Sequence, residues 1–176
     1  MKKTMLSTAI LLSLAAVSMS ANAAEIQFTG KITAQTCTLE SGDLKMELPT
    51  VGISDVADIN QHKGVTTISA PVKCEGATEN DKTVTMSLMP LQGSYTAKSV
   101  LTNTASADAA TGVGIVVLDK DQKAFDFDSG IANIEAPLVN GAANIQVSAA
   151  YAKDGSGSDV TAGNVNAVLP FVMTYQ

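Results

Sequence analysis

The chain has 176 residues, 45% of them hydrophobic, and its 17 acidic and 11 basic side chains give a formal net charge of −6. This length suits one domain with a sizeable core. The chain has no arginine, no tryptophan and no cluster of lysines. The composition therefore argues against nucleic-acid binding and against attraction to an anionic membrane surface.

The beginning of the chain has the pattern of an export signal. Two lysines follow the initiating methionine, an apolar run covers residues 5–19, and the small residues Ala-Asn-Ala end at Ala23. The run is too short and wrongly flanked for a membrane-spanning helix. The sequence therefore predicts a secretory signal peptide over residues 1–23 and an exported chain that begins at Ala24.

Residues 24–36 alternate like a β-strand. Inside this strand, a glycine stands where a large apolar residue would keep the rhythm. Such a glycine marks either the close approach of another backbone or a bulge in an ordinary first strand, and the sequence allows both. The residues on the apolar side of this strand are Ile26, Phe28, Gly30, Ile32 and Ala34.

The two cysteines, Cys37 and Cys74, lie in a chain predicted to be exported. A metal pair or a reactive thiol are the alternatives, but the chain has one histidine and no second cysteine pair. A structural disulfide is therefore the favoured interpretation, and it implies an oxidising compartment.

Short stretches of alternating apolar and polar residues continue along the chain, separated by turns and with almost no helical pattern. This spacing predicts one all-β domain, an antiparallel β-sandwich. Residues 154–163, rich in glycine and serine, are expected to form a loop. The expected strands lie within residues 31–40, 44–53, 65–74, 83–91, 111–125, 142–153 and 164–176.

Motifs of catalysis are missing from the sequence. The acidic stretch 119–128 has the wrong residues for a calcium loop at its fifth and sixth places, so a solvated hairpin is favoured. His62 has no nucleophile that the sequence pairs with it, and the methionines in strand patterns are expected to fill the core. The sequence offers no candidate catalytic, metal or cofactor site.

The last residues alternate up to the penultimate position, with Leu169, Phe171, Met173 and Tyr175 on one face. A strand with so apolar a face must be covered, because an exposed one promotes aggregation. The cover is either the protein's own core or, if one side of the sheet is open, another chain.

Four features together resemble the structural pilins of the chaperone–usher pathway, the subunits of type 1-like fimbriae. The resemblance covers essentially the whole precursor. It rests on the glycine-containing segment 26–37, the Cys37 and Cys74 pair, the strand at residues 112–119, and an ending with penultimate Tyr175 and, fourteen residues from the end, Gly163.

The resemblance implies an incomplete immunoglobulin-like β-sandwich over residues 37–176, which lacks its last strand and is completed by a donor strand from another subunit. Residues 24–36 would be this chain's own donor segment. Addition of such a strand gains affinity from backbone hydrogen bonds and register from alternate side chains. In this role Ile26, Phe28, Ile32 and Ala34 would fill pockets of a neighbour's groove, and Gly30 would lie where the groove is too shallow for a side chain.

The resemblance also implies a groove-edge strand that a periplasmic chaperone covers until an outer-membrane usher exchanges it for the next subunit's segment. Pro170 departs from the expected pattern because proline cannot donate a ladder hydrogen bond, and it predicts where pairing of that strand begins. The edge residues would be Gly163, Leu169, Phe171, Met173 and Tyr175.

The implied function is a structural subunit of an adhesive fimbria, exported through the periplasm to the cell surface. The major shaft subunit is favoured, since a tip adhesin of two domains would be much longer. A minor adaptor, a terminator with a blocked groove, and a self-contained secreted sandwich that binds a ligand are the alternatives. The expected partners are copies of itself or related pilins, the chaperone and the usher, with no nucleic acid, small-molecule substrate or enzyme activity.

Overall fold

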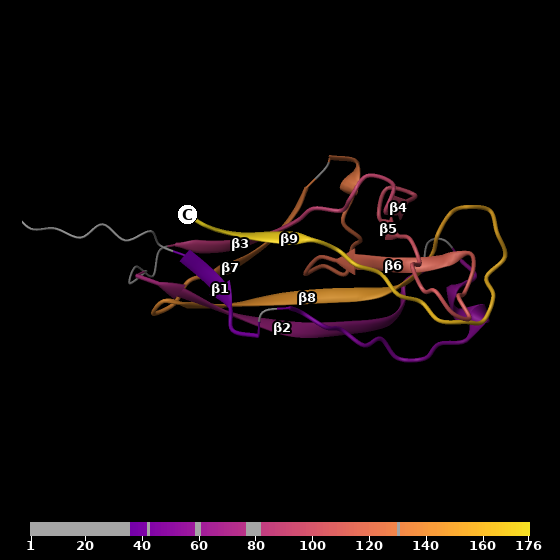
Figure 1. Ribbon diagram of the computed structural model, residues 1–176, viewed down its shortest axis with the longest axis horizontal. Helices are drawn as coiled ribbons and strands as arrows, with labels where there is room; N and C mark the ends of the chain where they lie inside the picture. The colour runs from indigo at the N-terminus through magenta and orange to yellow at the C-terminus, as the bar shows by residue number, and fades with distance from the viewer. Residues whose placement is uncertain (1–35, 42, 59–60, 77–81, 130) are drawn as a thin grey trace, which may run out of the picture. The chain divides into compact units, whose positions relative to one another are not determined.

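The computed structural model describes residues 36–41, 43–58, 61–76, 82–129 and 131–176. Within them the strands form two antiparallel sheets, of six strands and of three (Figure 1). The order in the larger sheet is β1 (Thr36–Leu39), β2 (Lys63–Glu75), β8 (Ala142–Lys153), β6 (Val113–Leu118), β5 (Val100–Leu101) and β4 (Tyr95–Thr96). The order in the smaller sheet is β7 (Ala132–Pro137), β3 (Thr83–Leu88) and β9 (Phe171–Tyr175).

Helical structure in the described ranges is limited to two 3₁₀ turns, η1 (Ile53–Val56) and η2 (Phe127–Ser129). None of the helices described is long and apolar enough to cross a bilayer. The all-β fold predicted from the alternating stretches is thus confirmed.

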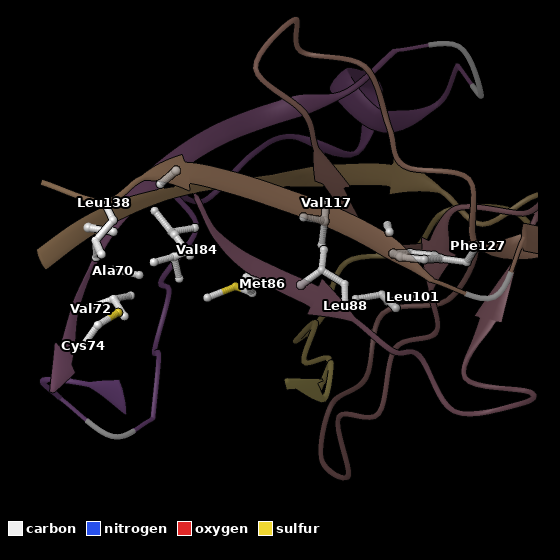
Figure 2. Close-up of a cluster of buried hydrophobic side chains, with 14 residues drawn as sticks. Ala70, Val72, Cys74, Val84, Met86, Leu88, Leu101, Val117, Phe127 and Leu138 are labelled. Atoms are coloured by element: carbon white, nitrogen blue, oxygen red, sulfur yellow. The ribbon is translucent and has the colours of Figure 1, made fainter. Parts of the chain in front are cut away.

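Alternation along the strands builds the core. On β2, Ala70 and Val72 are buried between exposed neighbours, and on β3 Val84, Met86 and Leu88 are buried in the same way between half-buried ones. Figure 2 shows these side chains gathered in one cluster. Other members of this cluster are Cys74, Leu101, Val117, Phe127, Leu138 and Ile145.

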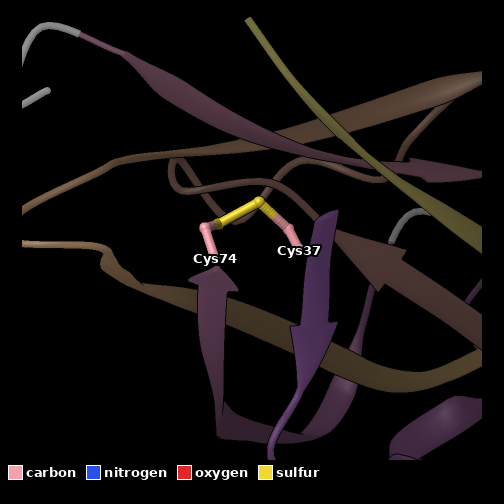
Figure 3. The surroundings of a disulfide bond; sticks show 2 residues. All are labelled: Cys37 and Cys74. Carbon is pink, nitrogen blue, oxygen red and sulfur yellow. A yellow bond between two sulfur atoms is a disulfide. The ribbon is translucent and has the colours of Figure 1, made fainter. Parts of the chain in front are cut away.

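The disulfide joins the first two strands (Figure 3). Cys37 of β1 lies directly opposite Cys74 of β2 in the register, and their sulfurs are 2.02 Å apart. The bond closes a loop with a sequence separation of 37 residues. The predicted disulfide is confirmed.

A two-residue turn carries the chain from β7 in the smaller sheet to β8 in the larger. Asn140 and Gly141 have φ angles of 52° and 78°, which asparagine and glycine tolerate better than other residues. Val139 and Ala142 exchange backbone hydrogen bonds of 2.7 and 3.0 Å on either side of the turn. The turn thus joins the edge strand of one sheet to an inner strand of the other.

Two expected strands differ from the structure. The sequence predicts a strand over residues 44–53, but no ladder hydrogen bonds give them a strand partner among the described residues. The final strand begins only at Phe171, directly after Pro170, as the missing N–H of that proline predicts. β7, which the sequence pattern does not predict, supplies the outer strand of the smaller sheet.

Candidate functional site

The strand β9 pairs with β3 from Phe171 opposite Leu88 to Tyr175 opposite Val84. In Figure 1 it is the yellow strand running beside β3. No strand pairs with its other edge among the residues that the structure describes. The inward side chains Phe171, Met173 and Tyr175 are half-buried against the core. β9 therefore presents a row of backbone hydrogen-bonding groups beside an apolar face.

A second extended segment runs along the other side of this edge. Leu44, Met46 and Leu48 are half-buried, and the residues between them, Lys45 and Glu47, are exposed. This alternation is that of a strand with one buried face. Residues 44–48 therefore have the side-chain pattern of a strand without a strand neighbour in the described part of the chain.

Between these two segments lies an apolar groove of about 180 Å³. Every residue that lines it is apolar. One wall is Leu44, Met46 and Leu48, and the other is Ala167, Leu169 and Phe171. The floor comes from both sheets: Ile68, Met86, Leu88, Leu101, Ile115, Val117, Val147 and Ala149.

Two further hollows adjoin the groove through shared lining residues. The first, of about 700 Å³, shares Met46, Leu48, Ile115 and Ala167 with the groove. The second, of about 590 Å³, shares Ser106, Tyr151, Val165 and Asn166 with the first. Neighbouring hollows thus share lining residues, and the three hollows together, here called the trough, are lined by parts of residues 44–56 and 160–171.

Gly163 lies at the far end of this trough, where its backbone packs on residues 108–110. A Cβ on Gly163 would lie 2.5 Å from the amide nitrogen of Ala110 and 2.7 Å from the carbonyl carbon of Ala109. Real Cβ atoms do not approach backbone so closely, so only glycine fits here.

The penultimate tyrosine occupies the other end of the edge strand. The Tyr175 hydroxyl is buried and has no hydrogen-bond partner among the described residues.

Pro170, directly before β9, marks the start of ladder pairing. Its carbonyl oxygen accepts a 2.8 Å hydrogen bond from the amide of Met89.

The sequence-predicted edge residues come together here. Leu169 and Phe171 line the groove, Met173 and Tyr175 continue the same face of β9, and Gly163 lines the hollow at the far end. The predicted donor residues Ile26, Phe28, Gly30, Ile32 and Ala34 lie outside the described residues.

Sequence reasoning misses two parts of the site. The alternation of residues 44–48 predicts an ordinary strand. No local pattern indicates that this segment has no strand neighbour in the described structure. Asn103, whose side chain bonds to residues 164 and 166 at the far end of the trough, is missed altogether. No local sequence pattern predicts that an asparagine side chain will bond to a backbone group 61 residues away.

The acidic stretch 119–128 begins with a tight turn. The Asp119 carboxylate accepts hydrogen bonds of 2.8 and 2.9 Å from the amides of Asp121 and Lys123. The side-chain hydrogen bond and charge of Asp121, 2.8 Å from the Lys120 amine, raise the pKa of Lys120. No group of three or more metal-ligating side chains was found in the part of the chain that the structure describes.

Comparison with known proteins gives one consistent result. The family model described as "Fimbrial protein" matches residues 26–176. The F7-2 fimbrial protein of Escherichia coli is 45% identical over 67 residues, 38% of this chain and 36% of that protein. The match therefore spans about a third of that relative's length. The KS71A fimbrillin of Escherichia coli is 28% identical over 191 residues, covering 93% of this chain and 94% of that protein.

Two solved structures share the fold. The CupB6 tip adhesin from Pseudomonas aeruginosa superposes with a TM-score of 0.60 at 22% identity, over 80% of this chain and 38% of that one. The P pilus rod subunit PapA superposes with a TM-score of 0.52 at 19% identity, over 86% of this chain and 100% of that one. Both comparisons bear on the fold alone.

Proposed function

The chain belongs to the fimbrial protein family, and from this premise we propose that it is a structural pilus subunit that polymerises by donor-strand exchange. Residues 24–36 of one copy enter the groove of the next and pair with the bare edge of β9. The observation that carries the proposal is the apolar groove between residues 44–48 and 167–171. Backbone hydrogen bonds to β9 supply affinity, and alternate side chains in the groove set the register.

The lengths and the sequence patterns of the two segments support this pairing. Ile26 to Ala34 is as long as Ala167 to Tyr175, and an extended segment of this length spans roughly 30 Å. Both segments alternate apolar side chains with polar or outward ones. A donor segment of this kind can cover the edge from end to end.

The open far end of the trough favours a shaft subunit over a terminator. A terminator would need a blocked groove, whereas here hollows of about 700 and 590 Å³ adjoin the groove beyond Ala167. A subunit with both a donor segment and an open groove can occupy any position inside a fibre. Because donor and groove are different parts of the chain, the contact is heterologous and extends into a filament.

The remaining assignments follow from the same proposal. Residues 1–23 direct export to the periplasm, residues 24–36 act as the donor segment, and residues 37–176 form the pilin domain. A periplasmic chaperone covers the groove before assembly, and an outer-membrane usher is the place of exchange. The groove has no catalytic task in this scheme.

A denaturant unfolding curve of residues 36–176, with and without a peptide of residues 24–36, tests the proposal. Binding to the folded state alone raises its stability, by about 2.7 kcal/mol at a peptide concentration 100 times the Kd. We expect a clear rise of the unfolding midpoint. Peptides carrying Phe28→Asp or Gly30→Leu should raise it less, because one puts a charge in an apolar groove and the other adds bulk at a shallow point.

A domain that is stable alone and ignores the peptide would contradict donor-strand exchange. The protein would then be better described as a terminator or as a self-contained secreted sandwich.

A further inference from the structure

The side chain of Asn103 joins two segments that lie far apart in the sequence. Its Nδ2 donates to the carbonyl oxygens of Ala110 at 2.9 Å and of Asn164 at 2.8 Å. Its Oδ1 accepts from the backbone amides of Ala105 at 3.0 Å and of Asn166 at 2.9 Å. An asparagine amide has two donors and an oxygen with two lone pairs, so backbone groups use its full capacity.

Further hydrogen bonds fasten the same two segments. Thr104 binds the carbonyl oxygen of Asn166 through its amide at 2.8 Å and its hydroxyl at 3.1 Å. The Asn164 amide donates to the carbonyl of Asp108 at 2.6 Å, and the Asn164 side chain donates to the carbonyl of Ala107 at 3.0 Å. Hydrogen bonds from residues 103–110 therefore hold residues 164–166 in place, and the Asn103 side chain bonds to both Asn164 and Asn166.

This stretch directly precedes the groove wall. Ala167 and Leu169 line the groove immediately after Asn166, and the next anchor is the hydrogen bond from Met89 to Pro170. Residues 167–169 of the wall thus lie between two hydrogen-bonded positions. Asn166 is bound by Asn103 on one side, and Pro170 is bound by Met89 at the start of β3–β9 pairing on the other. The spacing of the wall from residues 44–48 depends on both.

We infer that Asn103 is a positioning residue for strand addition: it holds the far end of the groove wall in place before the incoming strand arrives. The inference rests on the proposed donor-strand exchange. Ordering a wall costs conformational entropy, and a wall already ordered by the protein spares the incoming strand that cost. Asn103 makes no contact with the incoming strand in this role and acts through residues 164–166.

The test uses the full-length exported chain with its own donor segment disabled by Phe28→Asp, and a fluorescent peptide of residues 24–36 as the probe. Asn103→Ala removes all four hydrogen bonds. Asn103→Asp keeps the acceptor oxygen and loses both donors. Asn133→Ala is the matched control, since this amide accepts from Ser87 on the outer side of the smaller sheet. Peptide association rate, peptide affinity, unfolding midpoint and amide exchange at residues 166–169 are measured for each.

We expect Asn103→Ala to bind the peptide more slowly and roughly tenfold more weakly, because part of the binding free energy must then order the groove wall. Asn103→Asp should lie between Asn103→Ala and the parent chain. Amide exchange at residues 166–169 should rise in the Asn103 variants and not in Asn133→Ala.

Three results would overturn the inference in different ways. If the parent chain binds the peptide and Asn103→Ala binds it equally well, Asn103 only stabilises a loop, and donor-strand exchange is untouched. Binding losses that merely follow the unfolding midpoint across all variants, Asn133→Ala included, would likewise reduce Asn103 to a stabilising residue. If the parent chain does not bind the peptide at all, the proposed function fails and the inference fails with it.

Discussion

Two tyrosine hydroxyls in the described part of the chain differ in their hydrogen bonding. The Tyr95 hydroxyl donates to the carbonyl oxygen of Phe127 at 3.3 Å. The Tyr175 hydroxyl is buried without a partner among the described residues. A buried polar group without a hydrogen bond costs about 1–3 kcal/mol, so these two residues should respond in opposite directions to loss of the hydroxyl.

Tyr175→Phe should therefore raise the free energy of unfolding by about 1 kcal/mol, because it removes the buried unpaired oxygen. Tyr95→Phe is the matched control and should lower it by about 0.5–1 kcal/mol, because it removes a hydrogen bond. Urea unfolding of both variants measures the difference. If Tyr175→Phe destabilises the protein as much as Tyr95→Phe does, the Tyr175 hydroxyl has a partner in solution.

At the scale of elements, the wall at residues 44–48 has strand alternation without a strand neighbour in the described structure. Its inward side chains face the groove and its outward ones face solvent. A charge introduced on the two faces should therefore have different consequences, although the two positions are adjacent in sequence.

Met46→Asp should reduce binding of the 24–36 peptide at least about tenfold, since an unpaired carboxylate in an apolar groove costs several kcal/mol when a strand covers it. Lys45→Asp introduces the same side chain on the exposed face of this wall and should leave binding nearly unchanged. Titration of the peptide by fluorescence anisotropy compares them. Equal effects of the two substitutions would mean that this segment does not form a wall of the binding groove.

Strands with strong period-2 alternation are predictable from the sequence, as β2, β3 and β8 show. β7 escapes prediction although Ala132, Ile134 and Ala136 alternate with polar neighbours, because its inward residues are small or only half-buried. The edge residues of the groove follow from resemblance and from alternation. Their pairing across the sandwich, and the hold of Asn103 on residues 164–166, depend on tertiary contacts that no local pattern contains.

The reason for a glycine at position 163 is likewise not predictable from the sequence. The resemblance marks it as a groove-edge residue, but the reason for a glycine is the packing of its backbone on residues 108–110. A contact between segments more than 50 residues apart cannot be read from either segment alone.

For the whole molecule, one covalent bond limits how far the unfolded chain can expand. The Cys37–Cys74 bond closes a loop with a separation of 37 residues, which on the chain-entropy model stabilises the fold by about 4 kcal/mol. Reduction with a thiol reagent should lower the free energy of unfolding by about this amount, as measured by urea unfolding with and without reductant. Equal midpoints in the two conditions would show that the sheets carry the stability without the bond.

The bare edge of β9 also has a consequence for supply inside the cell. In the described part of the chain, β9 leaves one row of backbone groups and one apolar groove without a strand partner, and an exposed edge of this kind promotes aggregation unless it is covered. Under the proposed donor-strand exchange, each molecule made requires one covering strand from another chain. A cell that makes this chain faster than it makes covering strands would then accumulate uncovered, aggregation-prone molecules. The ratio of chain synthesis to covering-strand synthesis, and not the amount of either, would limit how much of the protein escapes aggregation.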